Sequence, residues 1–214
     1  MTDKITMTRG RFITMEGIEG VGKSTNMAFV QQYLEAKNIP LVLSREPGGT
    51  ALGEKIRELL LDHRNQSMAD DTELLLMFAA RAQHLNELIL PALEQGKWVL
   101  CDRFTDATYA YQGGGRGISA ARIAQLEEWV QGELRPDVTL LLDAPTDIGL
   151  ARAAGREQAA DRFEREKQAF FEKVRNCYLE MARAQPQRYR IIDASQSLDQ
   201  VTMQLRNVMD ALTV

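Results

Sequence analysis

The chain has 214 residues, of which 44% are hydrophobic and 26% are charged, and its formal net charge is −4 at pH 7. These values are typical of a soluble globular protein with one core, and they argue against a dedicated nucleic-acid-binding surface. No apolar run approaches the ~18 residues of a membrane-spanning helix, and the two cysteines indicate neither a disulfide framework nor zinc. We therefore expect a single cytoplasmic domain over residues 1–214, with a flexible leader over about 1–10 and with neither membrane nor nucleic acid as a partner.

The first predicted elements are a strand over residues 12–15 and a helix over residues 26–36. The loop between them fits the pattern G-x-x-x-x-G-K-[ST], with Gly17, Gly22, Lys23 and Ser24 at the fixed positions. Glycines let the backbone turn so that N–H groups point at phosphate oxygens, beside the positive end of the helix dipole. The lysine can reach the β- and γ-phosphates, and the serine hydroxyl can hold Mg²⁺. The strand and helix on either side disfavour the alternative, a chance glycine-rich turn.

Strand candidates alternate with helical stretches along the rest of the chain. The acidic pair Asp70 and Asp71 is expected to cap one helix, and the glycines of 113–117 are expected to end another. The expected strands cover 41–44, 98–102, 138–143 and 189–193, and the expected helices cover 52–61, 70–93, 106–112, 119–134, 147–154, 164–184 and 198–212. This order predicts an α/β fold with a five-stranded parallel sheet, helices on both faces and a ligand at the carboxyl ends of the strands.

Two charged residues stand at the end of the third predicted strand, at the sheet edge that carries the phosphate loop. Asp102 can bind Mg²⁺ through water or orient the acceptor, and Arg103 can hold an acceptor phosphate with paired N–H bonds. The alternative is a surface salt bridge at a strand end. Asp143 also ends a strand, but a proline-containing turn follows it, so it can equally be a turn residue or a helix cap.

The segment over about 152–164 is a polar, arginine-bearing interruption between two helices, which we interpret as a short lid. Phosphoryl transfer spreads negative charge over oxygen atoms, and a mobile segment can bring guanidinium groups to that charge. The alternative is a solvated connection with ion pairs along a helix, such as Arg162 with Glu166.

Other candidates carry weaker signals. Met77 and Phe78 have the helical spacing of core residues, whereas Arg81 cannot be buried without a partner, which favours a position at a cleft. The histidines His63 and His84 are isolated in the sequence, so they support neither a metal site nor a nucleophilic triad.

Three further motifs follow the phosphate loop: Arg45-Glu-Pro-Gly-Gly-Thr50, Asp102-Arg-Phe-Thr-Asp-Ala-Thr-Tyr-Ala-Tyr-Gln-Gly113 and Asp161-Arg-Phe-Glu164. With them the chain resembles the bacterial thymidylate kinases, which are P-loop nucleoside monophosphate kinases, from about Arg11 to the C-terminus. The resemblance implies a three-layer P-loop kinase fold with a short lid, and Mg²⁺-dependent transfer of the γ-phosphoryl group of ATP to dTMP in dTTP biosynthesis. It also implies a homodimer and, since the phosphate loop has no arginine, the subgroup whose lid supplies that charge.

The resemblance assigns roles to individual residues. It places an arginine pair and a glutamine at the phosphate and base of dTMP, a threonine beside thymine, a tyrosine against the sugar's 2′ position and a glutamate near the 3′-hydroxyl. The implied dTMP-binding residues are Glu19, Glu46, Pro47, Arg57, Met77, Phe78, Arg81, Arg103, Thr108, Tyr111 and Gln112. The implied ATP-binding residues are Gly17, Ile18, Glu19, Gly20, Val21, Gly22, Lys23, Ser24, Thr25 and Arg152. The implied catalytic residues are Lys23, Asp102, Arg156 and Arg162, and the metal ligands are Ser24 and Asp102.

Two departures from the family pattern leave assignments open. Many relatives carry a phenylalanine that stacks on thymine four residues before the Arg81 position; here that residue is Met77, and Phe78 is the alternative platform. The lid has an irregular length, so its three arginines compete for the catalytic charge. Two other functions also remain as alternatives: a kinase for another small acceptor, and a nucleotide-operated switch without a phosphoryl acceptor.

Overall fold

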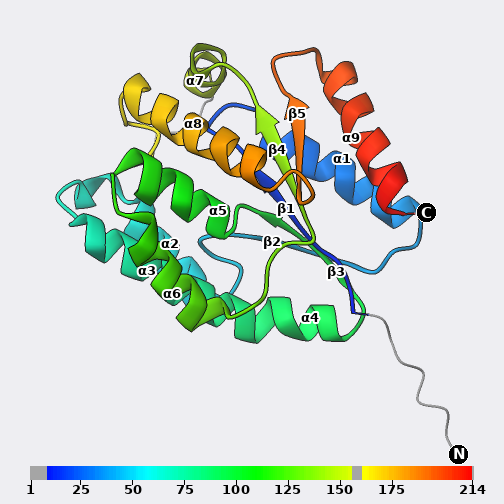
Figure 1. Ribbon diagram of the computed structural model, residues 1–214, viewed down its shortest axis with the longest axis horizontal. Helices are drawn as coiled ribbons and strands as arrows, with labels where there is room; N and C mark the ends of the chain where they lie inside the picture. The colour runs from blue at the N-terminus through cyan, green and yellow to red at the C-terminus, as the bar shows by residue number, and fades with distance from the viewer. Residues whose placement is uncertain (1–8, 156–160, 214) are drawn as a thin grey trace, which may run out of the picture.

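The computed structural model describes residues 9–155 and 161–213, and it is built around one parallel sheet (Figure 1). The strands are β1 (Phe12–Glu16), β2 (Leu41–Arg45), β3 (Trp98–Asp102), β4 (Val138–Asp143) and β5 (Tyr189–Asp193). Their order across the sheet is β2-β3-β1-β4-β5, and every neighbouring pair is parallel. The predicted five-stranded parallel sheet is confirmed, with β1 and β2 each one residue longer than expected.

Helical segments connect the strands. They are α1 (Lys23–Ala36), α2 (Ala51–Leu61), the 3₁₀ turn η1 (His63–Asn65), α3 (Asp70–His84), the π-helical η2 (Leu85–Ile89), α4 (Leu90–Glu94), α5 (Thr105–Thr108), the π-helical η3 (Tyr109–Gly115), α6 (Ala120–Gln131), α7 (Thr146–Ala154), α8 (Gln168–Ala184) and α9 (Leu198–Leu212). Figure 1 shows the sheet between helices on both sides, as expected for a three-layer α/β fold.

The central strand β1 is buried on both faces, because successive strand residues point to opposite sides of a sheet. Ile13 and Met15 share a hydrophobic core with Val30 of α1, beside which α9 packs. Phe12 points to the other face, where it packs with Leu93 of α4. Helix α3 packs between α2 and α6. The sheet is thereby fixed from both sides, with the carboxyl ends of β1 and β3 left at the edge that carries the phosphate loop.

Several element boundaries differ from the sequence prediction. Asp70 and Asp71 lie in the first turn of α3 rather than capping it, since the N-cap residue is Ala69. The helix expected over 70–93 is divided by the π-helical η2. The helix expected to begin at Glu164 begins instead at Gln168, because Asp161 accepts the N–H groups of two residues after it and holds a tight turn.

The helix expected over 106–112 continues as η3 through Gly115, so it ends inside the glycine run of 113–117 but later than expected. These glycines allow close packing against α8. A Cβ atom on Gly114 would lie 2.8 Å from Cβ of Cys177, and one on Gly115 would lie 2.4 Å from the ring of Phe170. Close approach between η3 and α8 therefore explains the glycines better than a turn does.

The end of the expected leader is packed against the domain. Residues 1–8 lie outside the described part of the chain, but the Gly10 N–H donates to the Leu93 carbonyl at 2.9 Å. A Cβ atom on Gly10 would lie 1.8 Å from the Lys97 carbonyl oxygen. The leader prediction therefore does not hold for this residue.

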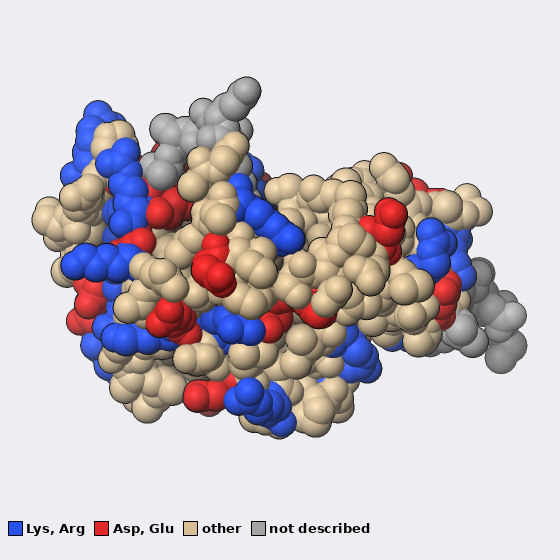
Figure 2. Space-filling model, turned by 90° about the horizontal axis from the view of Figure 1, so that it is seen from above, with Lys and Arg blue, Asp and Glu red and all other residues tan. Residues whose placement is uncertain are grey.

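Within the described part of the chain, neither the helices nor the charged surface side chains indicate a specialised environment. Among the described residues, no helix has both the length and the apolar character needed to cross a membrane. On the face shown in Figure 2, basic and acidic side chains are interspersed, without separating into large regions of one sign. The absence of a nucleic-acid partner stays a prediction.

Candidate active site

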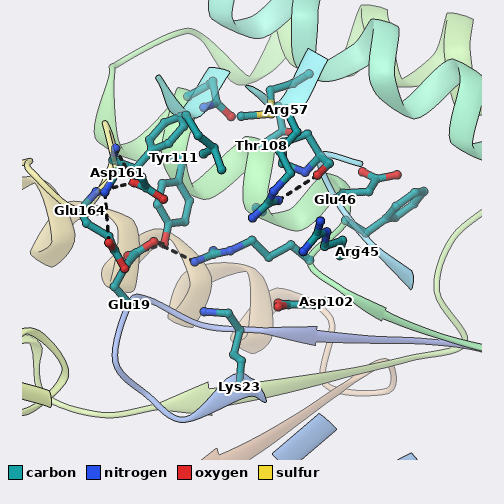
Figure 3. A pocket seen from close by; sticks show the side chains of 18 of the residues that line it. Glu19, Lys23, Arg45, Glu46, Arg57, Asp102, Thr108, Tyr111, Asp161 and Glu164 are labelled. Atoms are coloured by element: carbon teal, nitrogen blue, oxygen red, sulfur yellow. Dashed lines mark hydrogen bonds and ion pairs between the residues drawn. The ribbon is translucent and has the colours of Figure 1, made fainter. Parts of the chain in front are cut away.

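A cavity of about 490 Å³ lies at the carboxyl ends of the strands, beside the phosphate loop. Figure 3 shows Lys23 and Asp102 on the sheet side of this cavity, Glu19, Asp161 and Glu164 at one end and Glu46 and Thr108 at the other. Its lining includes the predicted residues Glu19, Gly20, Lys23, Ser24, Glu46, Pro47, Arg57, Met77, Arg81, Asp102, Arg103, Thr108, Tyr111 and Gln112. The fold therefore brings most of the predicted site residues to one place.

The phosphate loop has the backbone shape that its glycines predict. Gly17, Gly20 and Gly22 have φ values of 137°, 74° and 89°, in the left-handed region that favours glycine. Ile18 and Val21 point into the hydrophobic core, so they anchor the loop and leave ligand contact to its backbone. Helix α1 begins directly after Gly22, which places its N-terminus at the cavity.

Lys23 lies folded over its own loop, with Nζ donating to the carbonyls of Gly17 at 3.1 Å and Ile18 at 3.0 Å. Burial, together with the nearby charge of Arg103, lowers the pKa of Lys23 to about 8. A lysine whose charge is destabilised in this way gains from an anionic partner. The loop is therefore prepared to receive phosphate oxygens.

The last residue of β3, Asp102, and the residue that follows it, Arg103, both face the cavity. The Oδ1 atom of Asp102 is buried and has no hydrogen-bond partner among the described residues. Arg103 has a φ of 67°, uncommon for a residue with a side chain, and donates to Glu19 at 2.9 Å and to the Tyr178 hydroxyl at 3.3 Å. Its ion pair is thus inside the cavity, which disfavours the alternative of a surface salt bridge.

Glu19 is held by two partners at the end of the cavity. Besides Arg103, the Tyr111 hydroxyl lies 2.8 and 2.7 Å from its two carboxylate oxygens. The Arg103 guanidinium stacks over the Tyr111 ring, 4.6 Å from the centroid. Burial raises the pKa of Tyr111 well above its ordinary value, so its hydroxyl stays a donor. The three residues form one charge-assisted cluster, which brings together three residues assigned to dTMP.

A buried carboxylic acid, Glu16, supports this cluster through Phe104 and Tyr178, and it was not predicted from the sequence. Glu16, the last residue of β1, accepts the Phe104 N–H at 2.7 Å and the Tyr178 hydroxyl at 2.7 Å. Burial and the nearby Asp106 raise the pKa of Glu16 to about 8. An acidic residue at the end of a largely apolar central strand was the available sequence signal, because such a residue must be satisfied inside the fold.

The other end of the cavity is built around Arg81. Its Nε donates to Glu46 at 2.7 Å, and its Nη2 donates to Thr108 at 3.0 Å. The guanidinium lies 4.8 Å and 5.1 Å from the ring centroids of Phe78 and Phe104. Its third nitrogen, Nη1, is buried and has no partner among the described residues. The prediction that Arg81 requires a partner is confirmed, and Nη1 is left available to a ligand.

The two candidate base platforms occupy different places. Met77 lines the cavity. Phe78 is 2% exposed and packs with Leu74, Ile118 and Ile123 while contacting the face of Arg81. The geometry therefore favours Met77 as the side chain that faces a ligand and gives Phe78 a supporting role.

The lid arginines do not converge on the phosphate loop in the described part of the chain. Arg162 is buried, pairs with Glu73 and donates from Nε to the Leu60 carbonyl at 2.9 Å. The suggested pair of Arg162 with Glu166 is not formed, since Glu166 pairs with Arg116. Arg162 thus ties the lid's described end to α2 and α3.

The remaining predicted ATP and lid residues are placed as follows. Arg152 donates to the Ala194 carbonyl at 2.8 Å and is not among the residues that line the cavity. Thr25 is exposed in the first turn of α1. Arg156 lies outside the described residues. Asp143, expected as a turn residue or helix cap, is bound by Arg175 at 2.7 and 2.8 Å.

Gln112 lines the cavity and donates a hydrogen bond to Glu73 at 2.7 Å. Arg57 also lines the cavity, with Nη1 donating to the Pro47 carbonyl at 2.8 Å. This contact ties α2 to the loop after β2. Both side chains are therefore held in place by the protein itself.

Asp161, Glu164 and Arg45 also line the cavity but were given no site role from the sequence. The two acids stand at the ends of the quoted Asp-Arg-Phe-Glu motif, and Asp161 accepts the N–H groups of Phe163 at 2.8 Å and Glu164 at 2.9 Å. The motif itself was the available signal. No group of three or more histidine, cysteine or acidic side chains within 9–155 and 161–213 is arranged to hold a metal by itself.

Comparisons with known proteins agree with this geometry. The family model described as "Thymidylate kinase" matches residues 15–205. The chain is 58% identical over 203 residues to a thymidylate kinase of Alkalilimnicola ehrlichii, covering 95% of this chain and 94% of that protein. It is 60% identical over 203 residues to a thymidylate kinase of Ectopseudomonas mendocina, covering 95% and 96%.

A solved structure gives the same result at the level of the fold. The crystal structure of thymidylate kinase from Ehrlichia chaffeensis superimposes with a TM-score of 0.76 at 34% identity, covering 94% of this chain and 99% of that one. The matched family model spans the phosphate loop, the acceptor cluster and the described end of the lid. The chain therefore belongs to the thymidylate kinase family.

Proposed function

We propose that the protein transfers the γ-phosphoryl group of ATP to dTMP, giving ADP and dTDP, in the cavity beside the phosphate loop. The observation that carries the proposal is the convergence of Lys23, Asp102 and Arg103 with the Glu19–Tyr111 pair in one cavity. One side of this arrangement suits the phosphates of a donor nucleotide. The other suits an acceptor that has its own phosphate, sugar and base.

The reaction needs little from the protein in proton transfer. A phosphate oxygen of dTMP attacks the γ-phosphorus of ATP, a new P–O bond forms, and the bond from the γ-phosphorus to the β,γ-bridging oxygen breaks. The acceptor oxygen is already ionised at neutral pH, so no strong general base is required. Lys23 stabilises the charge that develops on the phosphoryl oxygens, and closure of the lid excludes water.

The residues around the phosphate loop fit a magnesium ion. Ser24 lines the cavity at the start of α1, and the unpartnered Oδ1 atom of Asp102 is the kind of hard oxygen that this cation prefers. We assign these two residues to Mg²⁺, with Asp102 acting through water. When bound, the ion neutralises charge on the β- and γ-phosphates.

The acceptor is held by residues at both ends of the cavity. Arg57 and Arg103 are placed to bind its phosphate, and Glu19 is placed to accept from the 3′-hydroxyl. Tyr111 limits the space at the sugar, because its ring is fixed among Phe163, Phe170 and Tyr178. Ribose should therefore be a poorer acceptor sugar than deoxyribose.

The base is assigned to the Arg81 end. Nη1 of Arg81 is a buried donor without a described partner, and a thymine carbonyl oxygen would satisfy it. Thr108, Gln112 and the loop of Glu46 and Pro47 complete this end of the cavity, with Met77 against the ring. The three lid arginines stay candidates for the transferred phosphate, and the contacts of Arg162 with Glu73 favour the other two.

ATP turnover with and without dTMP tests the proposal most directly. We expect ADP formation to depend on dTMP, with dUMP a weaker but detectable acceptor because one methyl group contributes only about 1 kcal/mol. Greater turnover with another acceptor would identify a different kinase. Equal ATP hydrolysis with and without acceptors would contradict the proposal and support the nucleotide-switch alternative.

We also propose that the protein is a homodimer that associates through α2 and α3. Leu52 and Leu59 of α2 and Leu75 of α3 are 50%, 52% and 56% exposed, and the two helices pack against each other. Such exposed leucines gain from burial against a second copy. Sedimentation analysis should show a dimer that dissociates in Leu59→Glu and not in Leu198→Glu, an equally exposed leucine at the start of α9.

A further inference from the structure

A chain of hydrogen bonds runs through the core from β2 to the Arg81 end of the cavity, where the thymine base is assigned. Ser44 Oγ lies 2.6 Å from Nε2 of His84, and Nδ1 of His84 lies 2.9 Å from Oε1 of Glu46. The other oxygen of Glu46 accepts from Arg81, which in turn donates to Thr108. His84 is 0% exposed, Glu46 5% and Arg81 2%, so each group depends on its neighbours for satisfaction.

The direction of these bonds follows from the chemistry of the groups. An ionised carboxylate only accepts hydrogen bonds, so Nδ1 of His84 must carry the proton that faces Glu46. In the neutral imidazole, Nε2 then accepts the hydroxyl proton of Ser44. His84 was isolated in the sequence, and only the packing of α3 against β2 gives it these partners.

The order serine, histidine, glutamate resembles a hydrolase triad, but its surroundings exclude that role. Ser44 is not among the residues that line the active-site cavity. The chain at Gly49 covers it, since a Cβ atom on Gly49 would lie 2.5 Å from both Ser44 Oγ and His84 Nε2. Glu46 is shared with Arg81 and points toward the base end of the cavity.

Arg81 depends on Glu46 for its orientation. The guanidinium is planar, so fixing Nε on Glu46 and Nη2 on Thr108 also fixes where Nη1 points. The rings of Phe78 and Phe104 confine the plane but leave rotation within it. If Oε1 of Glu46 loses its donor, the carboxylate can turn and Nη1 loses its direction.

We propose that His84 is a positioning residue for recognition of the acceptor base. It holds Glu46 through Nδ1, and Glu46 holds Arg81 so that Nη1 faces the cavity. The inference rests on the assignment of Arg81 to thymine in the proposed function. It adds that the selectivity of this end of the cavity is set by a side chain that touches no substrate.

The first test compares His84→Asn with His84→Gln. The amide nitrogen of asparagine can lie near the position of Nδ1 and donate to Glu46, whereas that of glutamine lies near Nε2 and reaches Ser44. We expect His84→Gln to raise the KM for dTMP about tenfold while the KM for ATP stays within about twofold, and His84→Asn to stay close to wild type. Equal KM values for dTMP in the two variants, or equal rises for both substrates, would overturn the proposal.

A double-mutant cycle separates this inference from the proposed function. Arg81→Met alone tests whether Arg81 binds the acceptor: an unchanged KM for dTMP would contradict the assignment of Arg81 to thymine, and with it this inference. If Arg81→Met raises that KM, the proposal expects His84→Gln to add little in its presence, because both changes remove the same contact. A full additional rise in the double variant would show that His84 acts independently of Arg81 and would refute the inference.

Discussion

At the scale of single residues, the site relies on side chains whose burial makes a ligand favourable. Lys23 has a pKa lowered to about 8 and bonds to its own loop, so ATP phosphates can replace two carbonyl contacts with a full charge interaction. Asp102 and Arg81 each keep a buried atom without a described partner. Such atoms cost stability in the free protein, which is consistent with their use in binding.

Lys23→Ala should lower kcat by about a hundredfold or more, because it removes charge stabilisation from the transferred group. The fold should be retained, since within the described part of the chain Nζ donates hydrogen bonds to two loop carbonyls at the cavity. The measurement is steady-state turnover with circular dichroism of the same sample, with Lys37→Ala at the exposed end of α1 as control. Near-normal turnover in a folded Lys23→Ala variant would contradict the phosphate-loop mechanism.

Arg103→Ala should weaken dTMP far more than ATP. Loss of a charge-assisted contact in a desolvated site costs on the order of 2 kcal/mol or more, about thirtyfold in affinity. Calorimetric titration with each nucleotide measures the difference, with Arg135→Ala as a control for removing an arginine that is paired at the surface. Equal losses for the two nucleotides would assign Arg103 to the whole site rather than to the acceptor.

At the scale of elements, the phosphate loop is held by helix α7 as well as by β1 and α1. Gly20 lies so close to α7 that a Cβ atom would be 1.7 Å from the Gly149 carbonyl oxygen. Gly149 also approaches the loop, since its own Cβ would lie 2.7 Å from the Glu19 carbonyl oxygen. The lid segment begins in the last turn of α7, so the phosphate loop and the start of the lid share one support.

Gly20→Ala should therefore have two effects. The left-handed backbone angle should lower stability, and the clash with α7 should displace the phosphate loop and weaken ATP binding. Gly117 is the matched control, because its φ of 83° is similar to the 74° of Gly20 and no described heavy atom lies within 4 Å of its Cβ position. Both substitutions carry the left-handed cost of about 1 kcal/mol, a fall in Tm of roughly 2–4 °C. Gly20→Ala should lower Tm further and raise the KM for ATP about tenfold. Equal effects of both substitutions on Tm and KM would contradict the shared support.

At the scale of the whole molecule, Glu16 connects the centre of the sheet to the site. It lies at the end of β1, holds the turn that carries Arg103 and is bound by Tyr178 from α8. Its pKa is raised to about 8 by burial and by Asp106, so the folded protein binds a proton there that the unfolded chain releases near its ordinary pKa. Stability then falls as pH rises between the two values.

Replacing Glu16 by glutamine should remove this pH dependence. Relative to Glu16→Gln, the wild type should lose unfolding free energy from about pH 5 to about pH 8 and change little above that, since both pKa values have then been passed. Urea unfolding of both proteins at several pH values measures the difference. A constant difference across this range would show that Glu16 is ionised in the folded protein throughout.

The sequence by itself determined the sheet, the phosphate loop and the acceptor motifs. Their signals are local: glycine spacing requires particular backbone angles, and apolar runs between turns require buried strands. It therefore predicted where Lys23, Asp102 and Arg103 meet, because carboxyl ends of parallel strands share one edge.

Only the tertiary structure decided how side chains far apart in sequence satisfy one another. Arg162 pairs with Glu73 rather than with Glu166. Phe78 contacts the guanidinium of Arg81, whereas Met77 lines the cavity. His84 is hydrogen-bonded to Glu46. Burial is the physical reason. A charged group taken out of water must find a partner, and which partner is within reach depends on how helices from distant parts of the chain pack on the sheet.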